Sequence, residues 1–248
     1  MGFFLPDLAW PAIVVFSGYM LLGLTGFGSA LVIVPLLAWQ WPLTHVVALT
    51  LLLDLPACLL HGGLNLKQVQ WNEIWRMLPG LALGSGMGLW LMHILEPRWP
   101  LLMLGLYVLA MGLRQMGNPN SPSRKLPSQA SVLAGGVAGL VEMMFGAAGP
   151  VLMTWLGWRL LDVMQLRATA PALIACSAFI VLGEMALTGS LYEGTLWHHW
   201  FWLIGAALLG TAIGDRMARS APKIWLTRAM ALLLVISGAS LLKRFLVL

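Results

Sequence analysis

The sequence predicts an all-α polytopic membrane protein made of two inverted repeats, and three observations lead to this fold class. Hydrophobic residues make up 60% of the 248 residues and charged residues only 9%, against about 25% charged in a soluble globular domain. Apolar runs follow one another with short connections, and most Lys and Arg residues fall between them. Landmarks of the first half also recur in the second half in the same order.

Eight apolar runs are separated by turn residues or charges. A polar segment, residues 117–128 (GNPNSPSRKLPS), divides the chain nearly in half and acts as a linker between two predicted membrane repeats, residues 1–116 and 129–248. The first residues lack the basic segment and cleavage site of a signal peptide, so no cleaved leader is expected. The runs cover residues 8–38, 44–62, 73–95, 99–116, 129–157, 168–187, 197–214 and 226–246.

Matching residues relate the two halves. Phe27-Gly28 corresponds to Phe145-Gly146 at an offset of 118 residues, and Trp71 corresponds to Trp197 at an offset of 126. The growing offset means that the second copy carries short insertions. Chance matching of glycines is the alternative, but the tryptophan pair and the constant order favour a duplication. Further matches are Ala48 with Ala168, Gly63 with Gly189, Gly84 with Gly210, and Gly88 with Gly214.

The first run of each half does not fit one membrane crossing. About 30 residues would form a helix of about 45 Å, which is too long for a core of about 30 Å and too short for two crossings. Glycines interrupt both runs, in GLTGFGS around Gly26 and in EMMFGAAGP around Gly146. A kink in one long helix is the alternative. We predict a glycine-broken helical hairpin in each repeat, followed by three transmembrane helices.

The distribution of positive charge predicts the topology. Lys and Arg cluster in residues 114–125, 159–167 and 216–228. All three clusters lie on the cytoplasmic side only if residues 129–157 form a hairpin. A hairpin plus three crossings reverses the direction of the chain, so the second repeat is predicted to be inverted relative to the first. This topology places Lys67 inside and Glu193 and His199 outside, whereas Lys243 and Arg244 at the external C-terminus count against it.

The two helix breaks are the predicted binding site. Broken helices expose backbone N–H groups and positive dipole ends, which can hold an anion within the membrane. Small residues let the backbone approach a ligand, and nearby hydroxyl groups add donors. Thr154 or Thr169 is a further candidate donor. The predicted substrate-binding residues are Thr25, Gly26, Phe27, Gly28, Ser29, Thr50, Phe145, Gly146, Ala147, Ala148 and Gly149.

Ionisable residues within the apolar runs are candidates for proton coupling or gating, because a charge in the bilayer is costly and usually functional. These residues are Asp54, His61, Glu142 and Glu184. Asp54 lies four residues after Thr50 and therefore on the same helix face. The alternative is that each is a neutral packing residue. Arg159 and Arg167 could attract anions to an inner vestibule or simply anchor the helix ends.

Several of these segments carry a family resemblance. GLTGFGSALVIVPLL, HVVALTLLLD and HGGLNLKQVQW in the first half resemble the sulfite exporter TauE/SafE family, as do VAGLVEMMFGAAGPVLMTWL, QLRATAPALIACS and GSLYEGTLW in the second. Ser29-Ala30-Leu31 and Ala147-Ala148-Gly149 stand where the family pattern has a glycine triplet. The resemblance implies a small permease for sulfur-containing anions such as sulfite, sulfoacetate or other sulfonates.

The function predicted from the sequence is therefore secondary transport of small anions by alternating access in a bacterial-type inner membrane. The partners expected are the anion and the lipid bilayer, with no nucleic acid, metal or other cofactor, and a homodimer is left open. No GxSG or HExxH motif indicates an enzyme. A membrane thiol-disulfide electron carrier using Cys58 and Cys176 is the alternative, and a channel or an assembly factor also stays open.

Overall fold

The chain is described by a computed structural model, which covers residues 5–62, 66–96, 98–116, 130–160, 162–218 and 235. Within these residues the chain forms helices and no strand. The predicted run 226–246 lies outside them apart from residue 235. The helices are α1 (Leu5–Thr25), α2 (Ser29–Leu37), α3 (Leu43–Gly62), a short 3₁₀ helix (Leu66–Gln68), α4 (Trp71–Ile94), α5 (Arg98–Met116), α6 (Ala130–Phe145), α7 (Gly149–Arg159), α8 (Val163–Leu187) and α9 (Gly194–Ala218).

Both long apolar runs are interrupted at their glycines, as predicted from the sequence. The first break separates α1 from α2, and the second separates α6 from α7. Gly28 has φ 98° and Gly146 has φ 62°, and this left-handed backbone is costly for residues with a Cβ. At about 1.5 Å per residue, the 9 residues of α2 and the 11 residues of α7 are too short to cross a core of about 30 Å. Each hairpin therefore ends in a half-helix.

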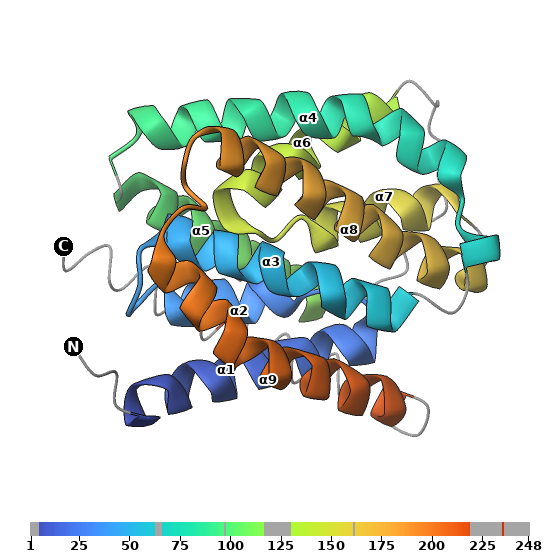
Figure 1. The fold of residues 1–248 in the computed structure, drawn as a ribbon. Coiled ribbons are helices and arrows are strands. Elements are labelled where there is room, and N and C mark those ends of the chain that lie inside the picture. The colour runs from blue at the N-terminus through green and yellow to red at the C-terminus, as the bar shows by residue number, and fades with distance from the viewer. Residues whose placement is uncertain are drawn as a thin grey trace.

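Six of the described helices pack as three pairs. Helices α4 and α6 pack along one side of the molecule, α1 and α9 pack along the other, and α3 and α8 lie between them (Figure 1). The contacts between the halves come in two matching sets. Helix α1 packs on α9, and helix α6 packs on α4. Helix α3 also packs on α9, and helix α8 also packs on α4. The first half thus contacts the second half through pairs of helices that the predicted repeat would make equivalent.

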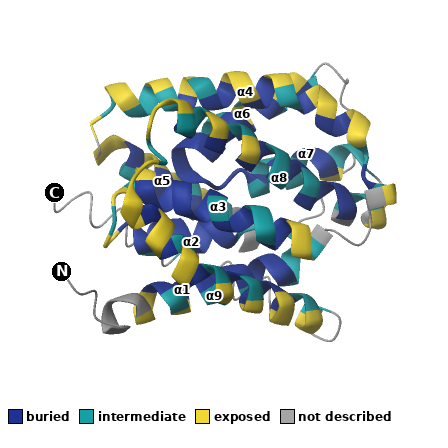
Figure 2. Cartoon of the chain, viewed as in Figure 1, coloured by how far each residue is buried: buried dark blue, intermediate teal, exposed yellow. Residues whose placement is uncertain are grey.

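The outer faces of the helices are apolar. Figure 2 shows buried residues facing the interior and exposed residues along the outer sides of α4 and α9. Large apolar side chains such as Leu83, Phe179 and Phe201 are more than 70% exposed, as expected where lipid replaces water. Among the described residues, four helices are long and apolar enough to cross a membrane: Leu43–His61, Trp71–Ile94, Met164–Leu187 and Gly194–Ala218.

A proline inside α3 creates one contact between the halves. Pro56 has no backbone N–H, so the carbonyl of Leu52 loses its partner within the helix. The indole Nε1 of Trp200 in α9 donates a hydrogen bond of 3.2 Å to that carbonyl. Inside a bilayer, a freed backbone group of this kind must find a partner in the protein. This contact therefore fixes the N-terminal half of α9 against the middle of α3.

Glycines bring the paired helices of each side into backbone contact. A Cβ added at Gly84 in α4 would overlap the backbone of Gly136 in α6. A Cβ added at Gly210 in α9 would lie 2.5 Å from the carbonyl oxygen of Phe16 in α1. Gly84 and Gly210 are one of the matched pairs from the sequence. Close packing through small residues is typical of transmembrane helices, and here it is found at both members of a pair that was matched in the sequence.

We expect Gly84→Ala to destabilise the protein by about 1–3 kcal/mol, because an overpacked core must shift rigid backbone. Gly86 of the same helix is the matched control, since a Cβ there meets nothing within 4 Å. Gly86→Ala should be neutral or slightly stabilising, by up to about 1 kcal/mol. Thermal unfolding of both variants in detergent measures the difference, and equal melting temperatures would show that the α4–α6 contact is looser than described.

Candidate functional site

The two helix breaks meet at one small cavity. A Cβ added at Gly149, the first residue of α7, would lie 3.2 Å from the Cβ of Phe27 in the first break. The cavity has about 10 Å³ of room for the centre of a water molecule, which corresponds to about one water. Its lining includes Phe27, Gly28 and Ser29 from the first break, Gly146, Ala147 and Gly149 from the second, and the carboxyl groups of Asp54 and Glu142.

Asp54 is buried beside the start of α2. Its Oδ1 accepts hydrogen bonds from the Tyr19 hydroxyl at 2.8 Å and from the Ser29 hydroxyl at 3.0 Å. The Asp54 side chain comes from the middle of α3, and Tyr19 comes from α1. Asp54 is 2% exposed and Tyr19 is fully buried. The carboxyl group therefore joins α1, α2 and α3 at the cavity.

Glu142 is buried beside the start of α7. Its Oε2 accepts a hydrogen bond of 2.6 Å from the backbone N–H of Ala148, and its Oε1 accepts one of 3.3 Å from the Ser177 hydroxyl of α8. Glu142 is 1% exposed. The sequence predicted free N–H groups at both breaks. At the second break the N–H of Ala148 is instead occupied by this carboxyl group, which comes from the preceding helix α6.

Two carboxyl groups thus lie at the N-terminal ends of the two short helices. The N-terminal ends of α2 and α7 face the cavity, and helix N-termini attract negative charge. Asp54 reaches the first of these ends through Ser29, and Glu142 reaches the second through Ala148. An ionised carboxylate here would repel an incoming anion, whereas a protonated one could donate a hydrogen bond to it. The charge at the two helix ends therefore depends on whether these two carboxyl groups are protonated.

Some predicted donors contact the backbone rather than the cavity. The Thr50 hydroxyl donates to Val46 O at 2.8 Å, and the Thr25 hydroxyl lies 2.6 Å from Phe27 O and 2.9 Å from Leu21 O. Neither threonine lines the cavity. Thr25 shapes the first break, because its hydroxyl spans the turn from the end of α1 to Phe27.

The remaining residues of the breaks have supporting positions. The N–H of Gly26 donates to Leu22 O at 2.6 Å, which closes the last turn of α1. The Phe145 ring stacks on Tyr107 of α5, with 5.9 Å between the ring centroids. The Tyr107 hydroxyl donates to Ala147 O at 2.8 Å. Helix α5 therefore contacts the second break through Tyr107. Ala148 stabilises the same break through its hydrogen bond to Glu142.

His61 and Glu184 lie apart from the cavity lining. Nδ1 of His61 at the end of α3 is 3.5 Å from Oδ1 of Asp215 in α9. Oε1 of Glu184 in α8 accepts a hydrogen bond of 2.8 Å from Ser85 in α4. Thr154 donates to Pro150 O at 2.7 Å, and Thr169 accepts from the N–H of Gln70 at 3.0 Å. All four residues connect helices or stabilise a helix turn.

Tyr19 and Ser177 contact the two carboxyl groups, and the sequence reasoning did not single them out. The available signal was weak for both. A buried tyrosine needs a partner for its hydroxyl, and Tyr19 is one of three tyrosines in the chain, but nothing in the sequence connects it with Asp54. Ser177 resembles many small residues of transmembrane helices. Contacts 35 residues apart, as both of these are, require the fold.

The two cysteines lie outside the cavity lining. Cys58 is buried in α3, Cys176 is half-buried in α8, and both are free thiols. The cavity lining includes neither of them. Within the described residues, no group of three or more His, Cys, Asp or Glu side chains is arranged to hold a metal ion.

Comparisons with known proteins identify the family. The family model described as Sulfite exporter TauE/SafE matches residues 11–241. A protein of Comamonas testosteroni, described as Probable inner membrane transporter protein TsaS, is 40% identical over 193 residues, which covers 78% of this chain and 81% of that protein. No solved structure matches. The match and the spanning-length helices confirm a multi-pass protein of the inner membrane. The chain belongs to the sulfite exporter TauE/SafE family.

Proposed function

We propose that the protein is a secondary transporter of small sulfur-containing anions, either sulfur oxyanions such as sulfite or sulfonates such as sulfoacetate. One observation carries the proposal: two glycine-broken helices from opposite halves of the chain meet at a cavity that also contains two buried carboxyl groups. The family description names sulfite export, and the relative is described as a probable transporter. The small anion and the lipid bilayer are the partners of this function.

The proposed architecture is an inverted repeat, with residues 1–116 and 129–248 as its halves and 117–128 as the linker. The exchange of equivalent helix contacts supports a two-fold relation, because a two-fold axis produces each contact twice. The parity of a hairpin plus three crossings supports inversion. In such transporters the binding site lies at the repeat interface near the middle of the bilayer, and the lining of one cavity by both breaks supports this arrangement.

The mechanism follows from the size and chemistry of the cavity. Room for about one water is too small for a sulfite or sulfonate group, so loading requires the half-helices α2 and α7 to separate. Protonation of Asp54 and Glu142 removes their repulsion and lets them donate hydrogen bonds to the anion. The helix ends then supply the remaining donors. Release of the protons with the anion would couple transport to the proton gradient.

A thermal-shift screen of the purified protein tests the proposal. Sulfite, sulfoacetate, taurine, thiosulfate, sulfate and simple carboxylates are compared with neutral sugars and inorganic cations. A ligand present at 100 times its dissociation constant stabilises the native state by about 2.7 kcal/mol. Stabilisation by one or more sulfur anions is expected. Stabilisation by cations or sugars alone would exclude the anion function.

A further inference from the structure

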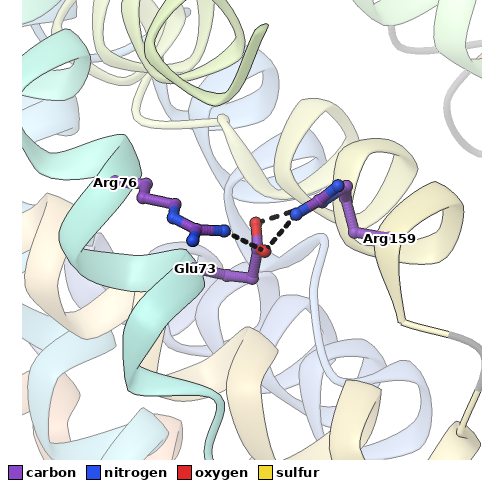
Figure 3. Close-up of polar contacts among 3 residues, drawn as sticks. All are labelled: Glu73, Arg76 and Arg159. Atoms are coloured by element: carbon purple, nitrogen blue, oxygen red, sulfur yellow. Dashed lines mark hydrogen bonds and ion pairs between the residues drawn. The ribbon is translucent and has the colours of Figure 1, made fainter. Parts of the chain in front are cut away.

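An ion pair at the buried carboxylate of Glu73 joins the two halves at one end of the helix bundle. Oε1 of Glu73 in α4 lies 2.6 Å from the Arg159 guanidinium of α7 and 3.3 Å from Arg76 (Figure 3). A second bond of 3.3 Å joins Nε of Arg159 to Oε2 of Glu73. Glu73 is 7% exposed. A two-point contact between a guanidinium and a carboxylate is both strong and specific in geometry, so it fixes the end of α7 against the start of α4.

A second polar cluster joins the halves at the opposite end. The His199 ring of α9 stacks on Trp41, which follows α2, with 4.2 Å between the ring centroids. Nδ1 of His199 is 3.0 Å from Nε2 of His45 in α3. Nδ1 of His45 is in turn 3.2 Å from the Glu193 carboxylate. Figure 1 places the start of α9 and the start of α4 at opposite ends of the bundle.

The two contacts occupy equivalent positions in the repeat. The offset of 126 residues that matches Trp71 with Trp197 also matches Glu73 with His199. The offset of 118 that matches Gly28 with Gly146 also matches Trp41 with Arg159. Each contact therefore joins the chain at the end of one half-helix to the start of the long helix α4 or α9 of the other half. At the start of α4 this contact is an ion pair between Glu73 and Arg159. At the start of α9 it is a cluster of the Trp41, His45 and His199 rings.

We infer that these two contacts are the gates of the transport pathway, and this inference rests on the transport function proposed above. Helix α7 begins at the cavity with Gly149 and ends at Arg159, so the Glu73–Arg159 pair holds it closed against α4. Helix α2 begins at the cavity with Ser29 and leads to Trp41, so the Trp41–His199 stack holds it closed against α9. Opening one contact frees one half-helix and exposes the cavity to one side of the membrane.

The ion-pair gate also explains how an anion can open it. Two guanidinium groups share one carboxylate, so the cluster of Glu73, Arg76 and Arg159 carries a net positive charge. An arriving anion can replace Glu73 as the partner of Arg159. Arg159 would then make the first contact with the substrate on that side, about ten residues of helix from the cavity. The cluster at the other end is built from the rings of Trp41, His45 and His199 and the carboxylate of Glu193, so the two gates differ in chemistry.

Side-specific thiol labelling tests the gates. A single cysteine is placed in the cavity by Ala147→Cys, after Cys58→Ala and Cys176→Ala remove the native thiols. A membrane-impermeant maleimide is applied to right-side-out and inside-out vesicles. Glu73→Gln is expected to raise the labelling rate about fivefold or more from one face only. His199→Ala is expected to raise it by a similar factor from the opposite face.

Arg76→Gln is the matched control for the ion-pair gate. Arg76 contacts Glu73 within α4, so its loss removes a charge from the cluster without breaking the link to α7. Because Glu73 keeps Arg159 as its partner in this variant, the labelling rate should stay well below that of Glu73→Gln. The charge exchange Glu73→Arg with Arg159→Glu restores an ion pair between the helices and should return labelling to the rate of the parent protein, even if the single variants prove unstable.

The outcomes separate the gates from the transport function. Three results would overturn the gates. The first is an unchanged labelling rate in Glu73→Gln, and the second is an equal increase in labelling from both faces. The third is an increase in Arg76→Gln as large as that in Glu73→Gln. Labelling does not require a transported substrate. If labelling increases from the expected face in each variant but the protein transports no sulfur anion, the gates are supported and the anion function is wrong. If anions move but labelling does not respond, the gates alone fail.

Discussion

Glu142→Gln is expected to abolish net transport driven by a proton gradient, with a loss of about 100-fold or more, the size found when a positioned proton-transfer group is removed. Gln keeps the length of the side chain and an oxygen that can accept the Ala148 N–H, but it cannot ionise. Transport is measured as accumulation of labelled sulfite or sulfoacetate in proteoliposomes. Exchange of anion for anion, which needs no net proton movement, should survive in the variant.

Glu184→Gln is the matched control for this result. Glu184 is also an acidic residue within an apolar helix, but it contacts Ser85 and lies apart from the cavity lining. Net transport by Glu184→Gln should stay within about twofold to threefold of the parent protein, since its contacts are structural. Proton-driven accumulation by Glu142→Gln at the parent rate would show that Glu142 only caps the second break.

Gly28→Val is expected to abolish transport while leaving a protein that still inserts into the membrane. Gly28 has φ 98°, and a β-branched residue in this region is strained by about 1–3 kcal/mol. A Cβ at this position meets nothing within 4 Å, so the cost comes from the backbone and from the side chain that now borders the cavity. Gly146→Val, with φ 62°, should have a similar effect on transport.

Gly205→Val provides the comparison for these substitutions. Gly205 lies in α9, is exposed, and would place its Cβ in open space without an unusual φ. This variant should transport anions at close to the parent rate. Uptake and export assays in vesicles, normalised to the amount of folded protein in each preparation, measure all three variants. Transport at the parent rate by both Gly28→Val and Gly146→Val would show that the two breaks are not part of the binding site.

The helix breaks were predictable because they depend on local chemistry. Glycines interrupt an apolar run that is too long for one crossing, and this pattern identified the separations of α1 from α2 and α6 from α7. The helical spacing of Thr50 and Asp54 was also predictable, and both face Tyr19. Tyr19, however, contacts the backbone carbonyl of Thr50 rather than its hydroxyl. The helical spacing therefore predicted the face of α3 on which Thr50 and Asp54 lie. It did not predict that Thr50 accepts the hydrogen bond through its backbone carbonyl.

The partners of the carboxyl groups were not predictable from sequence. Asp54 and Glu142 were recognised as ionisable residues in apolar runs, but their partners Tyr19 of α1 and Ser177 of α8 lie on other helices and are brought to them by the fold. The Glu73–Arg159 pair joins residues 86 positions apart, and Glu73 looks like an ordinary residue of a first helical turn. Only the close approach of the two halves brings these groups together.

The position of the bound anion tests the central claim most directly. Selenite has the shape and charge of sulfite, and selenium gives an anomalous X-ray signal that locates it in crystals of the protein. We predict a selenium peak between the two breaks, within hydrogen-bonding distance of the N-terminal end of α2 or α7. A selenium peak found only elsewhere on the protein, in crystals that bind selenite, would contradict the site.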